Sequence, residues 1–331
     1  MSMANLAKHL QQFFIGRLHN QLGASRHTVD SYRDTFRLLL KFAVKHYHRQ
    51  ASDLRVEDLD AKLVSAFLKH LEHDCHNSAR TRNTRLSAIH AFFGYASVNE
   101  PALATHCQCV LAIPAKRYER GPVQFLSDEE TVALLKAPDT RTWLGQRDQL
   151  LLQVALQTGL RNSELISLRR QDVELGTGAH IKCLGKGRKA RCTPLRADLA
   201  ARLAEWMAEL PPGPTTSVFP TAKGTAMSSD ALQRLVARHV KTAAKTCPSL
   251  RNKRVTPHSL RHTLAMTLLR RGVDITVIAL WLGHDSIETT QIYFHADMAI
   301  KEKALARTSS VTTPLKRYRP KDQLLAFLES L

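Results

Sequence analysis

The sequence predicts a mainly helical fold with a small β-sheet (α+β), and three observations lead to that prediction. Apolar residues recur at spacings of three and four through the first 110 residues. Short runs with a strand pattern then gather in one section, 171–195. Helical patterns resume at 197 and continue nearly to the C-terminus. With 331 residues, the chain is long enough for two domains with well-developed cores.

Residues 1–112 are predicted to form a helical domain. The stretch TVDSYRDTFRLLLKFAVKHY (28–47) shows the helical spacing clearly, and strand signals are absent from this part of the sequence. Ser25 and Ser52 are expected as N-caps, because a side-chain oxygen at that position accepts from the first helical N–H groups. Pro101 is expected to open another short helix.

A linker is predicted at 113–124, where prolines, a glycine and charged residues interrupt the helical pattern. Ser127, followed three residues later by Glu130, is typical of a capping box and marks a new helix. We therefore expect a second domain over 125–310, in which Gly159 interrupts the first long helical run.

Three strands are expected in the second domain, with GKGR as the turn between the last two. The strand segments are QDVEL (171–175), AHIKCLG (179–185) and ARCTPL (190–195). Further helices are expected at 197–210, at 228–246 and from Pro257 onward.

The charge of the chain points to a polyanionic partner. It has 48 Lys and Arg against 29 Asp and Glu, a net charge of +19. Six basic residues between 182 and 196 and seven between 234 and 254 have no acidic residue among them. Nucleic acid is therefore the expected partner. A membrane surface is disfavoured, because these basic segments are not paired with a wide apolar face.

The six cysteines favour free thiols in a reducing compartment over disulfides or a metal site. They form no CxxC pair, and HCQC (106–109) has no second ligand cluster at zinc-site spacing. No metal and no cofactor are expected. We also expect a cytoplasmic protein, since the N-terminus lacks the pattern of a signal peptide and no long uncharged apolar run is present.

Five short motifs follow one another through the second domain. They are TGLRNSEL (158–165), GKGRKAR (185–191), HSLRHT (258–263), LGH (282–284) and TTQIY (289–293). Together they resemble the tyrosine recombinase (phage integrase) family, and the helical N-terminal segment resembles the core-binding, SAM-like domain of that family. The resemblance implies a C-shaped clamp that closes around duplex DNA.

The resemblance also implies a set of catalytic residues, carried over position by position. These are Arg161, Lys186, His258, Arg261, His284 and Tyr293. The matching acidic position, Glu164, is expected to orient the site without doing chemistry.

The implied chemistry explains why these residue types are needed. Attack on a phosphodiester places extra negative charge on two non-bridging oxygens, and the guanidinium groups of Arg161 and Arg261 can donate paired hydrogen bonds to them. His258 and His284 would add donors around the same oxygens. The N-terminus of the helix that begins at Pro257 would reinforce this phosphate clamp.

In the same scheme Tyr293 is the nucleophile that forms a 3′-phosphotyrosyl enzyme, and Lys186 is the general acid for the leaving 5′-oxygen. Neighbouring residues of the same types are assigned differently. His262 and His295 are expected to be structural, and Trp281 is expected to belong to the core.

The sequence therefore predicts a site-specific DNA recombinase of the integrase or transposase type. One alternative is DNA relaxation of the type IB topoisomerase kind, which uses similar chemistry but needs only one protomer. A second is a DNA-binding regulator without catalysis, which would not need a nucleophile at this spacing. The residues leave open whether the reaction is integration, excision, transposition or dimer resolution.

The C-terminal tail, 311–331, is predicted to carry a short helix. Pro320 precedes apolar residues clustered on one helical face, Leu324, Leu325, Phe327, Leu328 and Leu331. So short a helix cannot bury that face by itself, so it must dock on its own domain or on a neighbouring protomer. The family resemblance favours the neighbour and a homo-tetramer on paired DNA sites.

Overall fold

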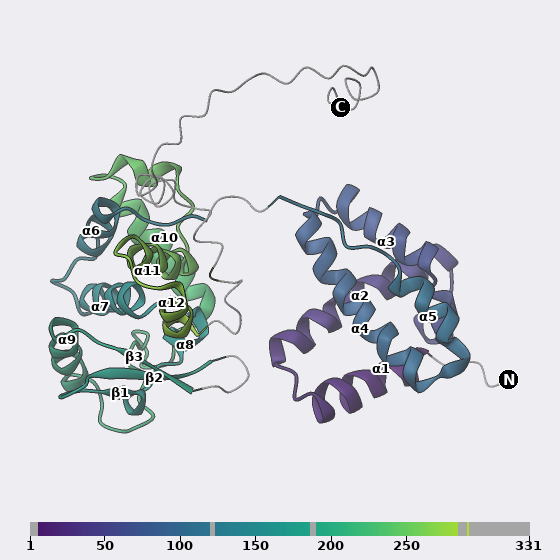
Figure 1. Cartoon of the computed structure of the whole chain (residues 1–331), viewed down its shortest axis with the longest axis horizontal. Coiled ribbons are helices and arrows are strands. Elements are labelled where there is room, and N and C mark those ends of the chain that lie inside the picture. Colours follow the sequence, from purple (N-terminus) through teal and green to yellow (C-terminus); the bar gives the residue numbers. More distant parts are fainter. Residues whose placement is uncertain (1–5, 120–122, 186–189, 284–289, 291–331) are drawn as a thin grey trace, which may run out of the picture. The chain divides into compact units, whose positions relative to one another are not determined.

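The computed structural model divides into two compact units, which are described one at a time (Figure 1). The units are Met1–Arg120 and Gly121–Leu331, and the residues described are 6–119, 123–185, 190–283 and 290. Helices dominate both units, and the named strands of the described residues form one three-stranded sheet. The predicted fold class is confirmed.

The described part of the first unit consists of helices joined by short connections. They are α1 (Leu6–Gln11), the π-helix η1 (Gln12–Gln21), α2 (Arg26–Tyr47), η2 (Ala51–Asp53), η3 (Val56–Asp58), α3 (Ala61–His73), α4 (Ala79–Asn99), η4 (Pro101–Leu103) and α5 (Ala104–Leu111).

The helix starts in this unit confirm two of the three expected caps. Ser25 caps α2, its side chain accepting from the Thr28 N–H at 3.2 Å, and Pro101 opens the 3₁₀ turn η4. Ser52 as an N-cap is wrong, because it lies inside the single turn η2. The cap of the next long helix is Asp60, whose carboxylate accepts from the Leu63 N–H at 2.7 Å.

Aromatic side chains fill the core of the first unit. Phe36 and Phe92 join α2 to α4 with ring centroids 5.2 Å apart, and Phe13 of η1 meets Phe92 at 5.5 Å. Both contacts are edge-to-face, the geometry that the ring quadrupole favours. All three rings are almost fully buried, so they hold the helices of this unit together.

In the second unit the sheet lies at one side of the group of helices (Figure 1). Its helices are α6 (Asp128–Lys136), α7 (Trp143–Thr158), α8 (Asn162–Ile166), η5 (Arg170–Asp172), α9 (Ala197–Ala208), α10 (Ser229–Ala243), η7 (Pro248–Asn252), α11 (Pro257–Arg270) and α12 (Ile275–Leu282). Its strands are β1 (Val173–Glu174), β2 (His180–Leu184) and β3 (Ala190–Pro194).

The three expected strands are present and pair in sequence order, β1-β2-β3, all antiparallel. In the β2–β3 ladder Cys183 lies opposite Arg191, and Leu184 lies opposite Ala190. Along β3 the residues alternate between exposed and more buried positions, with Arg191 and Thr193 on the inward face. The predicted turn GKGR (185–188) lies largely outside the described residues.

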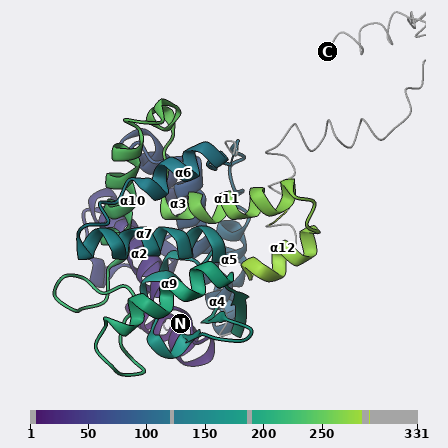
Figure 2. The same cartoon turned by 90° about the vertical axis from the view of Figure 1, so that its left-hand side faces the viewer.

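Helix α7 is the central helix of the second unit, and α11 packs against it (Figure 2). The expected capping box starts α6: Ser127 accepts from the Glu130 N–H, and the Glu130 carboxylate accepts from the Ser127 N–H. The expected interruption at Gly159 is the C-cap of α7, where φ is +63°. Gly159 is the second residue of the TGLRNSEL motif, so this turn lies inside the motif.

A second, smaller apolar cluster lies between α11 and α12. Leu264, Met266, Ile278 and Leu282 are buried in it, and Trp281 packs against it, as expected for a core residue. Across the described residues, no helix is both long and apolar enough to pass through a membrane.

Candidate active site

The candidate site begins where α7 ends. After Gly159 the chain turns, and Arg161 becomes the N-cap residue of the short helix α8. The Arg161 N–H donates to Glu164 Oε2 at 2.7 Å, and its Nη1 donates to Glu164 Oε1 at 3.0 Å. Glu164 therefore fixes both the backbone and the side chain of the first motif arginine.

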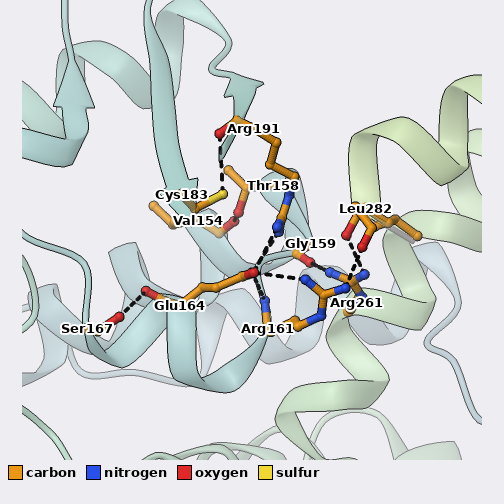
Figure 3. A network of polar contacts seen from close by, with 11 residues as sticks. Val154, Thr158, Gly159, Arg161, Glu164, Ser167, Cys183, Arg191, Arg261 and Leu282 are labelled. Carbon is orange, nitrogen blue, oxygen red and sulfur yellow. Dashed lines mark hydrogen bonds and ion pairs between the residues drawn. The ribbon is translucent and has the colours of Figure 1, made fainter. Parts of the chain in front are cut away.

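Arg191 reaches the same carboxylate from strand β3 (Figure 3). Its Nη1 donates to Glu164 Oε1 at 2.8 Å and its Nη2 to Glu164 Oε2 at 2.6 Å. Burial alone would raise the pKa of Glu164, but the hydrogen bonds from Arg191 and from the Arg161 N–H outweigh burial and hold the pKa below its usual 4.5. Glu164 is therefore ionised between two guanidinium groups.

Arg261 joins the ends of two helices. From the first turns of α11 it donates through Nη1 to the Gly159 carbonyl oxygen and through Nη2 to the Leu282 carbonyl oxygen, both at 2.5 Å. These carbonyls lie at the C-terminal ends of α7 and α12, where the helix dipole attracts a cation. The Arg261 side chain is buried.

Arg161 reaches the same turn after α12. Its Nη2 donates to the carbonyl oxygen of Gly283, the residue after Leu282, at 2.5 Å. Gly283 has a φ of +64°, a conformation that glycine adopts without strain. Arg161 and Arg261, 100 positions apart in the sequence, thus bind consecutive carbonyls of one turn.

His258 lies exposed in the first turn of α11. That turn is set by Pro257 at the first helical position and by a capping box between Thr256 and Ser259. The ring of His258 meets the ring of His262 edge-to-face, with centroids 4.3 Å apart. The contact agrees with a structural role for His262, which supports the His258 ring.

Three of the expected catalytic residues, Lys186, His284 and Tyr293, lie outside the described residues, as do His295 and the tail 311–331. In the sequence, Lys186 lies between strands β2 and β3, and His284 directly follows Gly283.

Arg191 is a residue of this site that sequence reasoning missed. It lies within a basic run, where a lysine or arginine is usually a solvated surface residue. The signal that identifies it is the period of two in ARCTPL, because Arg191 shares a strand face with Thr193, which is fully buried. A basic residue on the inward face of a strand needs a buried partner, and here that partner is Glu164.

The described residues contain no cluster of three or more His, Cys, Asp or Glu side chains able to hold a metal ion. The HCQC segment does not converge, since Cys107 is buried and Cys109 is exposed. Arginine and histidine, not carboxylates, dominate the candidate site.

Comparison with known proteins matches both units to one family. Residues 124–299 match the model described as phage integrase family, and residues 10–99 match the phage integrase N-terminal SAM-like domain. The chain is 51% identical over 328 residues to a Sinorhizobium fredii protein named integrase/recombinase y4rC, covering 99% of each chain. It is 33% identical over 290 residues to the tyrosine recombinase XerC of Xylella fastidiosa, covering 88% of this chain and 93% of that protein.

Solved structures share the fold at lower identity. The XerH site-specific recombinase in its post-cleavage complex with a palindromic difH substrate has a TM-score of 0.67 and 24% identity, covering 86% of this chain and 81% of that one. The Tn1549 transposon integrase with circular intermediate DNA has a TM-score of 0.67 and 16% identity, covering 89% and 98%. Taken with the family models and the full-length relatives, these findings show that the chain belongs to the phage integrase family of tyrosine recombinases.

Proposed function

We propose that this protein is a site-specific DNA recombinase that cleaves and rejoins strands through a covalent 3′-phosphotyrosyl intermediate on Tyr293. The observation that carries the proposal is the convergence of two arginines on one turn. Arg161 and Arg261 donate to consecutive carbonyls at 282–283, immediately before His284. Binding to DNA needs basic side chains, but it does not need three separate motifs to meet at one point.

The scissile phosphate would lie against this cluster. Arg161 retains 30% of its side-chain exposure and can turn N–H groups toward the non-bridging oxygens. The buried Arg261, held in place by two carbonyl oxygens, would add a positive charge close to the phosphate. His258 would add a hydrogen-bond donor at the N-terminus of α11. Each preorganised contact of this kind is worth roughly 2.7–4 kcal/mol in the transition state.

In the bond-breaking step, the Tyr293 oxygen bonds to phosphorus as the bond from phosphorus to the 5′-oxygen breaks. The phenol, whose ordinary pKa is about 10, passes its proton to water as it attacks, and the positive side chains around the phosphate favour that loss. Lys186 gives a proton to the leaving 5′-oxygen, and His284 donates to a non-bridging oxygen. Rejoining is the reverse, with a 5′-hydroxyl attacking the phosphotyrosyl bond. Since that bond keeps the energy of the phosphodiester, neither ATP nor a metal enters the scheme.

The partner in this scheme is double-stranded DNA, and the net charge of +19 supports it. Cleavage and exchange at two sites need four active protomers, so we propose a homo-tetramer on paired sites. The helical unit would act as the core-binding domain, 1–112, joined by 113–124 to a catalytic domain over 125–310. Acting on DNA, the protein would work in the cytoplasm.

The proposed nucleophile is tested by trapping the covalent intermediate. The protein is incubated with a nicked suicide substrate from its own genomic neighbourhood, and adducts are resolved on a denaturing gel. Tyr293→Phe should abolish the adduct while leaving DNA affinity unchanged. Tyr118→Phe, an exposed tyrosine of the first unit, is the matched control and should form the adduct at the wild-type rate. An undiminished adduct from Tyr293→Phe would contradict the assignment.

The proposed acid is tested in the same assay. Lys186→Ala should slow cleavage by about 10²–10⁴-fold, whereas Lys182→Ala, an exposed lysine paired with Glu174, should have little effect. A 5′-bridging sulfur needs no protonation to leave and should rescue Lys186→Ala. Cleavage should also survive excess EDTA, and a requirement for magnesium would point to a nuclease-like mechanism.

The tail, 311–331, is proposed to dock on a neighbouring protomer and so to couple the subunits. Its five clustered apolar residues and the family resemblance support this proposal. Removing the tail should leave one-site DNA binding nearly unchanged and impair pairing of two sites and full strand exchange, both measured on native gels. Relaxation of supercoils by a single protomer, without strand exchange, would favour the topoisomerase alternative.

A further inference from the structure

Arg191 is placed to control how much of the charge of Arg161 faces the substrate. The Arg191 guanidinium makes two hydrogen bonds to the Glu164 carboxylate, of 2.8 and 2.6 Å. The Arg161 guanidinium makes one, which is longer, at 3.0 Å. Both Glu164 and Arg191 are largely buried, with side-chain exposures of 6% and 11%.

The consequence follows from the geometry of the two pairs. A carboxylate and a guanidinium prefer a two-bonded, fork-to-fork pair, which neutralises both charges. If Arg191 were absent, Glu164 would be free to form that pair with Arg161. With Arg191 on both oxygens, Glu164 holds Arg161 by its N–H and by one edge of the guanidinium.

Arg191 also lies next to the turn at Gly283, whose carbonyl oxygen accepts from Nη2 of Arg161. A Cβ on Gly283 would lie 2.9 Å from Arg191 Cδ and 3.0 Å from its Nη1, so the side chain passes directly beneath that turn. The Arg191 Nε is buried without a hydrogen-bond partner within the part of the chain described. Burying this N–H group without a partner is unfavourable, and it accompanies the position of the guanidinium between Glu164 and the Gly283 turn.

We propose that Arg191 is a positioning residue for the phosphate clamp: by taking both oxygens of Glu164 and supporting Gly283, it keeps the Arg161 charge available to the scissile phosphate. This inference rests on the proposed recombinase function. It assigns Arg191 no contact with DNA. Its loss therefore affects the charged transition state more than the affinity for DNA.

The test compares two substrates in adduct formation by the full-length protein. One carries an ordinary scissile phosphodiester, and the other a methylphosphonate, in which a methyl group replaces one charged non-bridging oxygen. Arg191→Met should slow the reaction on ordinary DNA by about 10²-fold, the order expected for a misplaced catalytic group. On the methylphosphonate the loss should shrink to less than about tenfold, since less charge has to be met.

Arg191→Lys gives a second variant that keeps the charge in the core. It cannot bind both carboxylate oxygens as a fork, so it should show an intermediate loss with the same substrate dependence. Arg196→Met is the matched control, because Arg196 follows the same strand but is exposed and paired with Asp198. It should behave as wild type on both substrates.

The outcomes separate this inference from the function on which it rests. If wild-type protein forms no adduct with either substrate, the recombinase proposal fails. If the wild type reacts but the Arg191 variants lose equal factors on both substrates, or lose nothing, the positioning role is wrong. DNA affinity, measured on the same variants, should change far less than the rate on ordinary DNA, and thermal unfolding checks that each variant is folded at the assay temperature.

Discussion

Two buried carboxylates near opposite ends of helix α7 both accept hydrogen bonds from basic side chains. Asp148, in the first turns of α7, accepts from Arg147, Arg238 and His239. Glu164, just beyond the end of α7, accepts from Arg161 and Arg191. In both cases burial would raise the pKa of the carboxyl, and the hydrogen-bond donors instead lower it.

The difference lies in where the paired arginines can reach. The Arg147 side chain is 7% exposed, donates to the Pro220 carbonyl at 2.8 Å and lies over the Trp143 ring. Arg161 is 30% exposed and lies beside the turn that precedes His284. A buried ion pair is thus not in itself a sign of function. The distinguishing feature is that the Arg161 guanidinium is held by Glu164 on one side while part of it remains exposed to solvent.

Removing either carboxylate should destabilise the second unit, and this is the largest effect we expect. Asp148→Ala leaves buried donors unpaired and should lower the free energy of unfolding of the second unit by about 3–5 kcal/mol. Glu164→Ala should cost a similar amount, because Arg191, whose side chain is 11% exposed, is left buried without its partner, although Arg161 can turn to water. Trp143, Trp206 and Trp281 are all in the second unit, so tryptophan fluorescence in denaturant reports its unfolding.

The reaction rates of the two variants should differ, even though their losses of stability are similar. Folded Asp148→Ala protein should form the covalent adduct at close to the wild-type rate, while Glu164→Ala should be slowed strongly. Equal rate losses in the two variants would remove the distinction between a structural and a functional carboxylate.

The glycine turn after α7 should give the next largest effect. A Cβ on Gly159 would lie 2.7 Å from Leu282 Cδ2 and 2.9 Å from Leu264 Cδ2. Gly159→Ala should therefore cost about 1–3 kcal/mol for overpacking, in addition to roughly 1 kcal/mol for the left-handed backbone. Gly272→Ala is the control, since its φ is +82° but no heavy atom lies within 4 Å of the added Cβ. A similar cost at both positions would mean that the turn after α7 is not tightly packed.

Local signals predicted most of the fold and part of the site. The Ser127 and Glu130 box, the Gly159 turn and the three strands each depend on a few adjacent residues, and each was found. Ser52 was wrongly expected as a cap because it lies inside the single turn η2, whose N-cap residue is Gln50.

Contacts between distant segments could not be predicted in the same way. The bond from Arg161 to Gly283 joins residues 122 positions apart, and the pair of Arg191 with Glu164 crosses from a strand to a helix. Motif order indicates that such residues belong to one site. The carbonyls and carboxylate that hold them depend on how the helices pack.

Acid should weaken both carboxylate networks. Since the folded-state pKa values of Asp148 and Glu164 lie below the usual 3.8 and 4.5, their stabilisation is complete above those values and is lost as the pH falls through the lower, folded-state values. The stability difference between wild type and Asp148→Asn should therefore be constant between pH 5 and 7 and should narrow below about pH 3.8. Denaturant titrations at several pH values measure it. A difference that widens on acidification would show that Asp148 is not ionised in the folded protein.

The smallest effect should come from replacing Arg238. This variant tests whether every arginine bound to a buried carboxylate contributes equally to stability and to the reaction rate. Arg238 donates to Asp148 Oδ2 at 2.7 Å, a bond as short as those of Arg191, but its side chain is 61% exposed. Water and salt screen such a pair, and Asp148 keeps its bonds from Arg147 and His239 when Arg238 is removed. Arg238→Gln should therefore cost less than about 1 kcal/mol and leave adduct formation unchanged. Unfolding in denaturant and the adduct assay measure the two quantities on the same preparation. A rate loss as large as that of Arg191→Met would mean that burial does not distinguish the two arginines, and that the network around Asp148 also reaches the reacting phosphate.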